Sequence, residues 1–234
     1  MAFFKKMKHY CLEGIENFRD IGGYETPYGE TAYGVIYRSG SLFGATEKDL
    51  LTIKSLQIKT IIDLRSDDDK AKYPSKTLED TEIKTIYLPT NGNGRVPRNR
   101  FDQVNSYLEM LEDKETASKI FRTILNAPKP LLIHCHAGKD RTGVFISTLL
   151  LMNGVSIEDV NADYLLSFPY TQKLTAHTKA FHKEFSKIIY TPSVDFLYRV
   201  FKKFNKKYGG LDGYFSKIGF SEDEKQKLSH LLEK

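Results

Sequence analysis

A cysteine and an arginine stand six positions apart in the segment His134-Cys135-His136-Ala137-Gly138-Lys139-Asp140-Arg141-Thr142-Gly143. An apolar run at residues 131–133 precedes this segment, and an apolar, helix-like stretch at residues 144–152 follows it. A loop that leads from a strand into a helix offers backbone N–H groups and the positive end of the helix dipole to an anion. We therefore expect a phosphate-binding loop with a nucleophilic cysteine at its base.

The residue types in the loop fit displacement at phosphorus. The helix start and Arg141 both favour the thiolate of Cys135, which is the attacking form of cysteine. Arg141 can hold two phosphoryl oxygens with its planar fork, and Gly138 lets the backbone approach the anion. Thr142 can donate its hydroxyl toward the sulfur. We expect Cys135 to attack, a phosphocysteine to form and water to release phosphate, with an aspartic acid protonating the leaving oxygen.

The elements that must position this loop alternate between strands and helices. Short, β-branched apolar runs indicate strands covered on both faces at residues 34–37, 59–64, 85–88 and 131–134. Helix signals fall between and after them, at residues 46–56, 115–125, 144–152 and 156 onward, and residues 89–101 are a polar loop. The final third indicates helices only, at 192–207 and 221–232. We expect an α/β fold with a central, mostly parallel sheet flanked by helices and a helical C-terminal third.

The pattern His-Cys-x5-Arg-Thr-Gly resembles the signature of cysteine-dependent protein tyrosine phosphatases. The fuller string, with Ala-Gly-Lys-Asp inside it, resembles a bacterial branch that acts on phosphotyrosine and often on phosphoinositides. Blocks at residues 17–23, 37–42, 62–66 and 208–214 resemble other motifs of that branch. The resemblance spans residues 17–230 and implies a protein tyrosine phosphatase-like fold. Since neither an internal repeat nor a clear linker is evident, we expect one phosphatase domain over residues 1–234.

The resemblance also implies roles for individual loop residues. Cys135 matches the nucleophile, Arg141 the phosphate clamp and Asp140 the general acid. The mobile Trp-Pro-Asp acid loop of ordinary tyrosine phosphatases cannot be present, because the chain has no tryptophan. Three other aspartates remain candidates for the acid, namely Asp63, Asp102 and Asp163.

A second set of residues is expected to bind the substrate and its phosphate. The loop contributes His136, Ala137, Gly138, Lys139 and Thr142. Similar phosphoinositide phosphatases use a lysine at the position of Lys139 to hold additional inositol phosphates, whereas His136 replaces a lysine that some lipid enzymes carry. Asp63 and Arg65 close a predicted strand, where α/β sheets place ligand sites. A purely structural Asp63–Arg65 pair is the alternative.

The composition sets the broad class. The chain has 234 residues and a net charge of +5, which permits an anionic substrate, and no nucleic-acid-binding motif is present. Two cysteines cannot build a disulfide framework. No secretory signal and no apolar stretch of membrane-spanning length is evident, so we expect a cytoplasmic protein without stable membrane insertion. We expect neither a metal nor a cofactor, and the oligomeric state stays open.

Phosphotyrosine in a protein is the leading substrate, with phosphoserine, phosphothreonine and phosphoinositides as extensions. Two alternatives use the same loop: a catalytically silent phosphate-binding module and a sulfurtransferase-like cysteine enzyme. The silent module would lack the nucleophile, the arginine or the acid, and all three are present here. Lysines 179, 183 and 187, with apolar residues between them, predict an amphipathic helix that covers the site as a lid, lies at a membrane interface or packs on the core.

Overall fold

The protein is built on a five-stranded sheet, seen in a computed structural model that describes residues 8–76, 82–91, 94–181 and 187–233. The strand order is β1-β4-β7-β5-β6. Four neighbouring strands run parallel, and β1 at the edge is antiparallel. This confirms the expected mostly parallel sheet. The strands are β1 (Arg19–Asp20), β4 (Ile36–Ser39), β5 (Thr60–Asp63), β6 (Lys84–Tyr87) and β7 (Leu131–His134), and a separate hairpin pairs β2 (Glu25–Thr26) with β3 (Gly29–Glu30).

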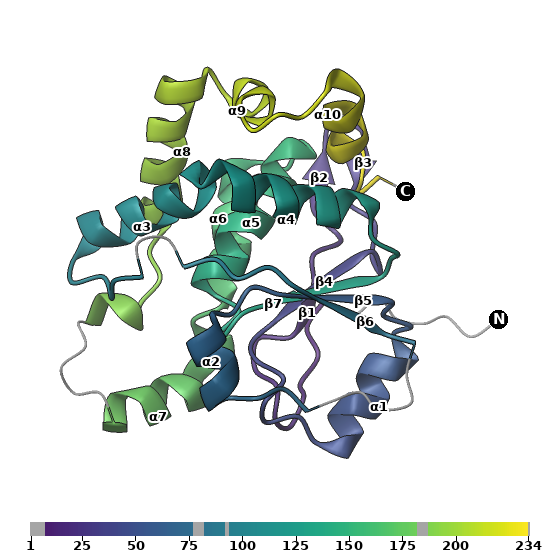
Figure 1. Ribbon diagram of the computed structural model, residues 1–234, viewed down its shortest axis with the longest axis vertical. Helices are drawn as coiled ribbons and strands as arrows, with labels where there is room; N and C mark the ends of the chain where they lie inside the picture. Colours follow the sequence, from purple (N-terminus) through teal and green to yellow (C-terminus); the bar gives the residue numbers. More distant parts are fainter. Residues whose placement is uncertain (1–7, 77–81, 92–93, 182–186, 234) are drawn as a thin grey trace.

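Alternating side chains give the sheet two apolar faces. Ile61 and Leu132 are buried on one face with Ile53 of α1 (Glu47–Ser55). Ile62 and Ile133 are buried on the other face under a thicker helical layer. Figure 1 shows α1 and α2 (Asp67–Lys72) on one side of the sheet and the larger helical layer on the other. Helices therefore cover both faces, as the sequence predicts, although unequally.

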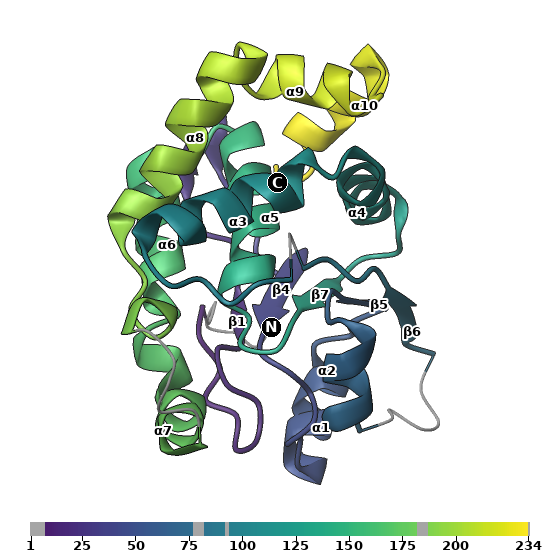
Figure 2. The same ribbon diagram turned by 60° about the vertical axis from the view of Figure 1, so that its left-hand side comes forward.

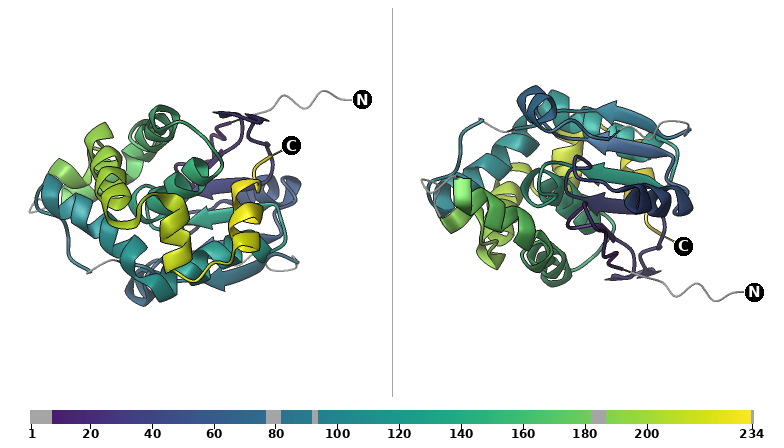
Figure 3. Two further views of the ribbon diagram at one scale, coloured as in Figure 1. Left: turned by 90° about the horizontal axis from the view of Figure 1, so that it is seen from above. Right: turned by 90° about the horizontal axis from the view of Figure 1, so that it is seen from below.

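The larger layer is formed by α3 (Arg100–Glu112), α4 (Lys114–Asn126), α5 (Asp140–Met152), α6 (Ile157–Leu166), α8 (Val194–Tyr208), α9 (Leu211–Lys217) and α10 (Glu222–Ser229). α7 (Gln172–Phe181) lies outside this layer, at the lower end of the molecule in Figures 1 and 2. Short 3-10 turns lie at Pro169–Thr171 and Lys187–Ile189. α8 lies alongside α3, as Figure 2 shows, and the views from above and below show the C-terminal helices stacked over this layer (Figure 3). The described part of the final third is helical, as expected. Within the described ranges, no helix has the length and apolarity needed to cross a membrane.

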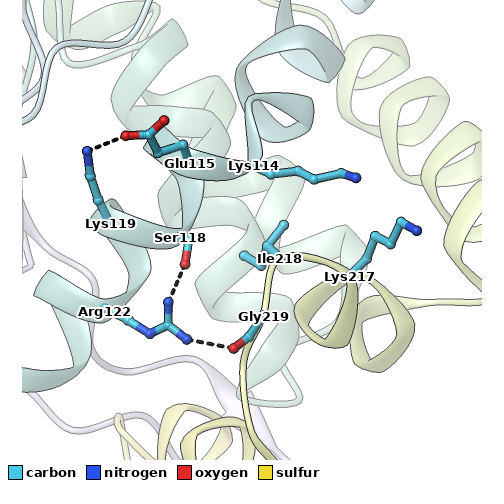
Figure 4. Close-up of a pocket in the computed structure, with 8 residues that line it drawn as sticks. All are labelled: Lys114, Glu115, Ser118, Lys119, Arg122, Lys217, Ile218 and Gly219. Carbon is cyan, nitrogen blue, oxygen red and sulfur yellow. Dashed lines mark hydrogen bonds and ion pairs between the residues drawn. The ribbon is translucent and has the colours of Figure 1, made fainter.

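Arg122 of α4 joins the C-terminal helices to the rest of the fold. Its guanidinium donates to Glu224 Oε1 at 2.7 Å, to the carbonyl of Gly219 at 2.6 Å and to Ser118 Oγ at 2.6 Å. Figure 4 shows the contacts to Ser118 and Gly219 at the wall of a cavity of about 480 Å³ between α4 and α9. The lining of this cavity contains no residue of the Cys135 loop.

Several element boundaries differ from the sequence predictions. The strand expected at 34–37 lies at Ile36–Ser39, because Gly34 has a positive φ of 76° and belongs to the preceding turn. α2 was not predicted, and α3 begins inside the expected 89–101 loop, at Arg100. Of the helix expected to span the lysines at 179–187, the described part is α7, which reaches Phe181, while Lys187 lies in a 3-10 turn. Residues 182–186 lie outside the described residues.

Candidate active site

The loop between β7 and α5 carries the candidate nucleophile. Cys135 follows the last residue of β7 and is only 2% exposed. Gly138 has a φ of 64°, and a Cβ at this position would lie 2.1 Å from the carbonyl oxygen of Ser39. Because L residues strain at this φ and no space exists for a side chain, glycine is required for the loop to close against β4.

The carbonyl groups of the loop are held from behind. The backbone N–H of Ser41 donates to the carbonyl of His136 at 2.8 Å. Asn17 Nδ2 donates to the carbonyls of Ala137 and Gly138 at 2.9 and 3.0 Å, and Arg38 Nη2 donates to Gly138 at 2.7 Å. In the described chain, the N–H groups of residues 136–138 donate to no protein acceptor. They are therefore available, together with the start of α5, to bind an anion.

Arg141 also has donors available for the anion that the loop N–H groups would bind. Its Nη1 lies 2.7 Å from Asp69 Oδ2 of α2, while its Nε and Nη2 have no partner within the described residues. Burial raises the pKa of the Asp69 carboxyl, but the charge and hydrogen bond of Arg141 outweigh burial and hold the pKa below its usual range. The ion pair orients the guanidinium and leaves the Nε–Nη2 fork for a phosphate.

Asp69 was missed by the sequence analysis. The only local signal is a helix start: Ser66 Oγ accepts the N–H of Asp69 at 3.2 Å, which is an N-cap geometry. The contact with Arg141 spans 72 positions of the chain, so no spacing rule could have found it.

Asp140, the expected general acid, is the first residue of α5. Its Oδ1 accepts the hydroxyl of Tyr107, which lies 2.7 Å from the hydroxyl of Tyr164. Burial, followed by the charge of Asp140, raises the pKa of Tyr107 well above its ordinary value, so this hydroxyl remains a donor at neutral pH. The Asp140 side chain is 31% exposed and can reach a bound substrate. The two tyrosines fix its orientation and were not predicted.

The three other aspartates have structural partners. Asp163 is buried, with its carboxylate 2.9 Å from Arg19 and 2.5 Å from Arg38. Burial alone would raise its pKa, but these two charges hold the pKa far below its usual range, so it has no proton to give. Asp102 accepts two hydrogen bonds near the start of α3. Asp63 is bound by Arg65. Burial raises the pKa of the Asp63 carboxyl, but the hydrogen bonds and charge of Arg65, together with the charge of His134, outweigh burial and hold the pKa below its usual range.

Arg65 donates all five of its guanidinium N–H groups to the protein. Two go to Asp63, with the shorter contact at 2.7 Å, and the others go to Ser41 Oγ at 3.0 Å, the carbonyl of Tyr73 at 2.6 Å and Ser75 Oγ at 2.7 Å. A phosphate could bind here only by breaking one of these bonds. The geometry favours the structural alternative for Asp63 and Arg65, not their predicted role in phosphate binding.

The three remaining polar side chains of the loop differ in their contacts. Lys139 is 5% exposed and its ammonium donates to the carbonyl of Ile189, in the turn before α8. Thr142 Oγ1 and His136 Nδ1 are both buried without a hydrogen-bond partner. An unpaired hydroxyl at Thr142 fits the expected donation to the sulfur. Of the described residues, no group of three His, Cys, Asp or Glu is placed to hold a metal ion.

Comparison with known proteins identifies the family. A sequence profile described as "Tyrosine phosphatase family" matches residues 10–234. The chain belongs to the tyrosine phosphatase family. This confirms the resemblance inferred from the loop and from the outer motifs, and the fold described above is that of this family.

Individual relatives show how far the similarity extends. A protein of Cupriavidus necator is 30% identical over 175 residues, which cover 67% of this chain and 62% of that protein. The "Triple specificity protein phosphatase PtpB" of Mycobacterium tuberculosis is 23% identical over 272 residues, covering 94% of this chain and 98% of that protein. An Arabidopsis thaliana protein named "Phosphatidylinositol 3,4,5-trisphosphate 3-phosphatase and protein-tyrosine-phosphatase PTEN1" is 31% identical over 105 residues, covering 44% and 24%.

Proposed function

We propose that this tyrosine phosphatase family member hydrolyses phosphomonoesters through a phosphocysteine intermediate. The proposal rests on one observation. The buried thiol of Cys135 lies at the base of a loop whose free N–H groups and whose Arg141 fork surround the same space. These donors match the three non-bridging oxygens of a phosphate monoester, and they stabilise the charge that develops on those oxygens in the transition state.

In the first step, the Cys135 thiolate attacks phosphorus, an S–P bond forms and the bond from phosphorus to the ester oxygen breaks. The leaving oxygen takes a proton from Asp140, which Tyr107 orients. Arg141 stays on two phosphoryl oxygens throughout. This assignment leaves Asp140 as a carboxylate next to the phosphocysteine.

In the second step, Asp140 takes a proton from a water molecule that attacks phosphorus. The S–P bond breaks, inorganic phosphate leaves, and the sulfur departs as a thiolate. The buried hydroxyl of Thr142, which has no protein partner, donates to this sulfur and makes it a better leaving group. The cycle ends with the enzyme in its starting protonation state.

We assign phosphotyrosine in proteins as the leading substrate, with phosphoserine, phosphothreonine and phosphoinositides as extensions. The family and the names of the relatives support this range: one relative is named for triple specificity, and another for both a phosphoinositide and a protein phosphatase activity. Lys139 is the residue on which lipid turnover depends in this proposal, because it belongs to the loop and its buried ammonium lies 3.4 Å from Oδ2 of Asp140. To receive a second phosphate, it must exchange the carbonyl of Ile189 for a phosphate oxygen.

A chromogenic phosphomonoester and two cysteine variants test the chemistry. Cys135→Ser should abolish turnover, whereas Cys11→Ser should retain it, because Cys11 is an exposed thiol without a role in the loop. Acid quenching of the wild-type reaction should trap one phosphoryl group on Cys135. Activity that survives in Cys135→Ser, or a trapped group on another residue, would refute the mechanism.

Arg141→Lys provides a second test of the fork. Lysine retains the charge but not the planar pair of donors, so kcat/KM should fall by about 100-fold or more.

A panel of phosphotyrosine peptides, phosphoserine peptides and inositides, assayed with the wild-type protein, establishes the substrate range. A preference for inositides over every peptide would contradict the assignment of phosphotyrosine as leading substrate.

A further inference from the structure

The cavity between α4 and α9 has a positively charged lining. Of the described residues that line it, one is a carboxylate, Glu115, and four are cations, namely Lys114, Lys119, Arg122 and Lys217. The first three cations belong to α4, and Lys217 is the last residue of α9 (Figure 4). The cavity measures about 480 Å³, which is within the range of about 300–1,000 Å³ that small-molecule sites in proteins occupy. Its charge and size therefore suit a small anion.

Two of the four cations are neutralised by carboxylates of the protein. Lys119 Nζ lies 2.6 Å from Glu115 Oε1, and Arg122 Nε lies 2.7 Å from Glu224 Oε1 of α10. Arg122 also donates to the carbonyl of Gly219, so its guanidinium is fixed to the segment between α9 and α10. These two pairs shape one wall of the cavity and leave its net charge to the other two lysines.

Lys114 and Lys217 carry the charge that remains. Both side chains are exposed, and within the described ranges neither ammonium has an ion pair or a hydrogen bond. Figure 4 shows them extending from α4 and from α9 toward the same side of the cavity. A phosphate monoester has a charge of about −1.5 to −2 at neutral pH, so one such group balances the two lysines. Because the lysines come from two helices, this group also joins α4 to α9.

Ser118 adds a polar group to the wall of the cavity. It is only 8% exposed, and its Oγ accepts a hydrogen bond from Arg122 Nη1 at 2.6 Å. Among the residues that the structure describes, its hydroxyl hydrogen has no acceptor, so it can donate to an oxygen in the cavity. Ile218, which is 6% exposed, belongs to the same lining and offers an apolar surface. The cavity thus combines a donor for a phosphate oxygen with an apolar contact for an organic group.

The cavity lies apart from the phosphate-binding loop. Its lining contains no described residue between Cys135 and Arg141. α4 and α9 belong to the larger helical layer, whereas α2, which contacts Arg141 through Asp69, lies on the other side of the sheet (Figure 1). An anion in the cavity therefore leaves the loop unoccupied, and binding at the two places can be measured separately.

We propose that the cavity between α4 and α9 is a second anion site, which binds the phosphate group of a small organic phosphate monoester. Lys114 and Lys217 neutralise the phosphate. The hydroxyl of Ser118 donates to one of its oxygens, and the organic group packs on Ile218. The inference goes beyond the proposed function and does not depend on it, because no residue of the Cys135 loop takes part.

Calorimetry with phenyl phosphate as the probe tests this site in a protein whose loop is disabled. The Cys135→Ser/Arg141→Ala background removes the nucleophile and the phosphate clamp, so the binding that remains comes from elsewhere. Lys114→Ala/Lys217→Ala, here called the cavity variant, should weaken this binding by about tenfold or more, because two charged hydrogen-bond donors are lost.

The matched control is Lys54→Ala/Lys202→Ala, which removes the same charge from exposed positions of α1 and α8. It should keep the affinity of the loop-disabled background. If the Arg141 change disturbs the fold, the Cys135→Ser protein with an intact Arg141 gives the same answer through the number of bound ligands. Two are expected in that protein, and one is expected when the cavity variant is added to it.

Two further probes identify the ligand. Inorganic phosphate lacks the organic group and should bind about three- to tenfold more weakly than phenyl phosphate, because the contact with Ile218 is lost. Equal affinities would show an adventitious ion only. Tighter binding of a phosphoserine peptide than of phenyl phosphate would assign the cavity to protein docking and overturn the small-molecule ligand. The absence of binding in the loop-disabled background, or an equal loss in the control, would overturn the site itself.

Discussion

Replacing Asp69 by asparagine tests whether this residue braces the phosphate clamp. Asp69 and Arg141 are only 27% and 14% exposed at the side chain, and they meet at 2.7 Å. A hydrogen bond between charged groups of this kind contributes about 1.5–3 kcal/mol, and a neutral acceptor contributes about 1 kcal/mol. Asp69→Asn keeps an acceptor but loses the charge, so about 0.5–2 kcal/mol of the free energy that orients Arg141 is lost.

That loss corresponds to a fall in kcat of about two- to thirtyfold. Removing a negative charge near the loop also makes an anion easier to bind, so the inhibition constant of inorganic phosphate should change by no more than about threefold. Steady-state kinetics on a chromogenic phosphomonoester, with phosphate as inhibitor, measures both quantities. Asp68→Asn is the matched control, because it removes an equal charge from an exposed position of the same helix.

The opposite pattern would refute this reasoning. An unchanged kcat, with phosphate binding more than about tenfold tighter, would make Asp69 an internal competitor that occupies Arg141 until the substrate displaces it. An equal fall in kcat in Asp68→Asn would show that the effect comes from the change in net charge alone.

Three further predictions follow from other contacts. Asp140→Asn should flatten the alkaline limb of the pH–rate profile for esters with poor leaving groups, because a general acid is lost as the pH rises, and an unchanged profile would move the general acid to another residue. Lys139→Ala should lower kcat/KM for a polyphosphorylated inositide more than for a phosphotyrosine peptide, and equal falls would assign the lysine to the reactive phosphate. The hydrogen bond from Arg122 lowers the pKa of Glu224 to about 2, so its stabilisation is complete above the unfolded value of about 4.3 and is lost as the pH falls toward 2. The melting temperature of Glu224→Gln should therefore lie below wild type at pH 6, the gap should shrink by about half near pH 3 and close only near pH 2, and a constant gap would contradict the assignment.

The sequence allowed the phosphate-binding loop to be predicted because the loop is contiguous. Cys135, Gly138 and Arg141 follow one another between a strand and a helix, and spacing alone defines their geometry. The groups that orient the loop could not be predicted in this way. Tyr107 meets Asp140 across 33 positions, and Asp69 meets Arg141 across 72, so both contacts depend on how helices pack against the sheet.

The dependence on packing between distant segments also explains which strands and helices could be predicted. Apolar periodicity located β5, β6 and β7 to within a residue or two, although β6, at the edge of the sheet, is largely exposed and not covered on both faces as expected. β1 has only two residues, and α2 presents three aspartates in its first turn and buries none of its residues. β1 and α2 are positioned by polar contacts, so the sequence shows no apolar pattern that would predict them. The Asp63–Arg65 pair illustrates the point: the chain order shows that the two residues are close, but only the tertiary partners of Arg65 show that its donors are already used.

The cluster of Arg19, Arg38 and Asp163 has a consequence for how the site responds to ionic strength. Two guanidinium groups share one carboxylate, all three are buried, and Arg38 touches the loop at the carbonyl of Gly138. Burial lowers the pKa of Arg38 only to about 10, so it keeps its charge under physiological conditions. Dissolved ions screen exposed charges over about 8–10 Å but reach buried ones far less. The attraction of the loop for a phosphate should therefore persist in concentrated salt, where the contribution of surface lysines fades.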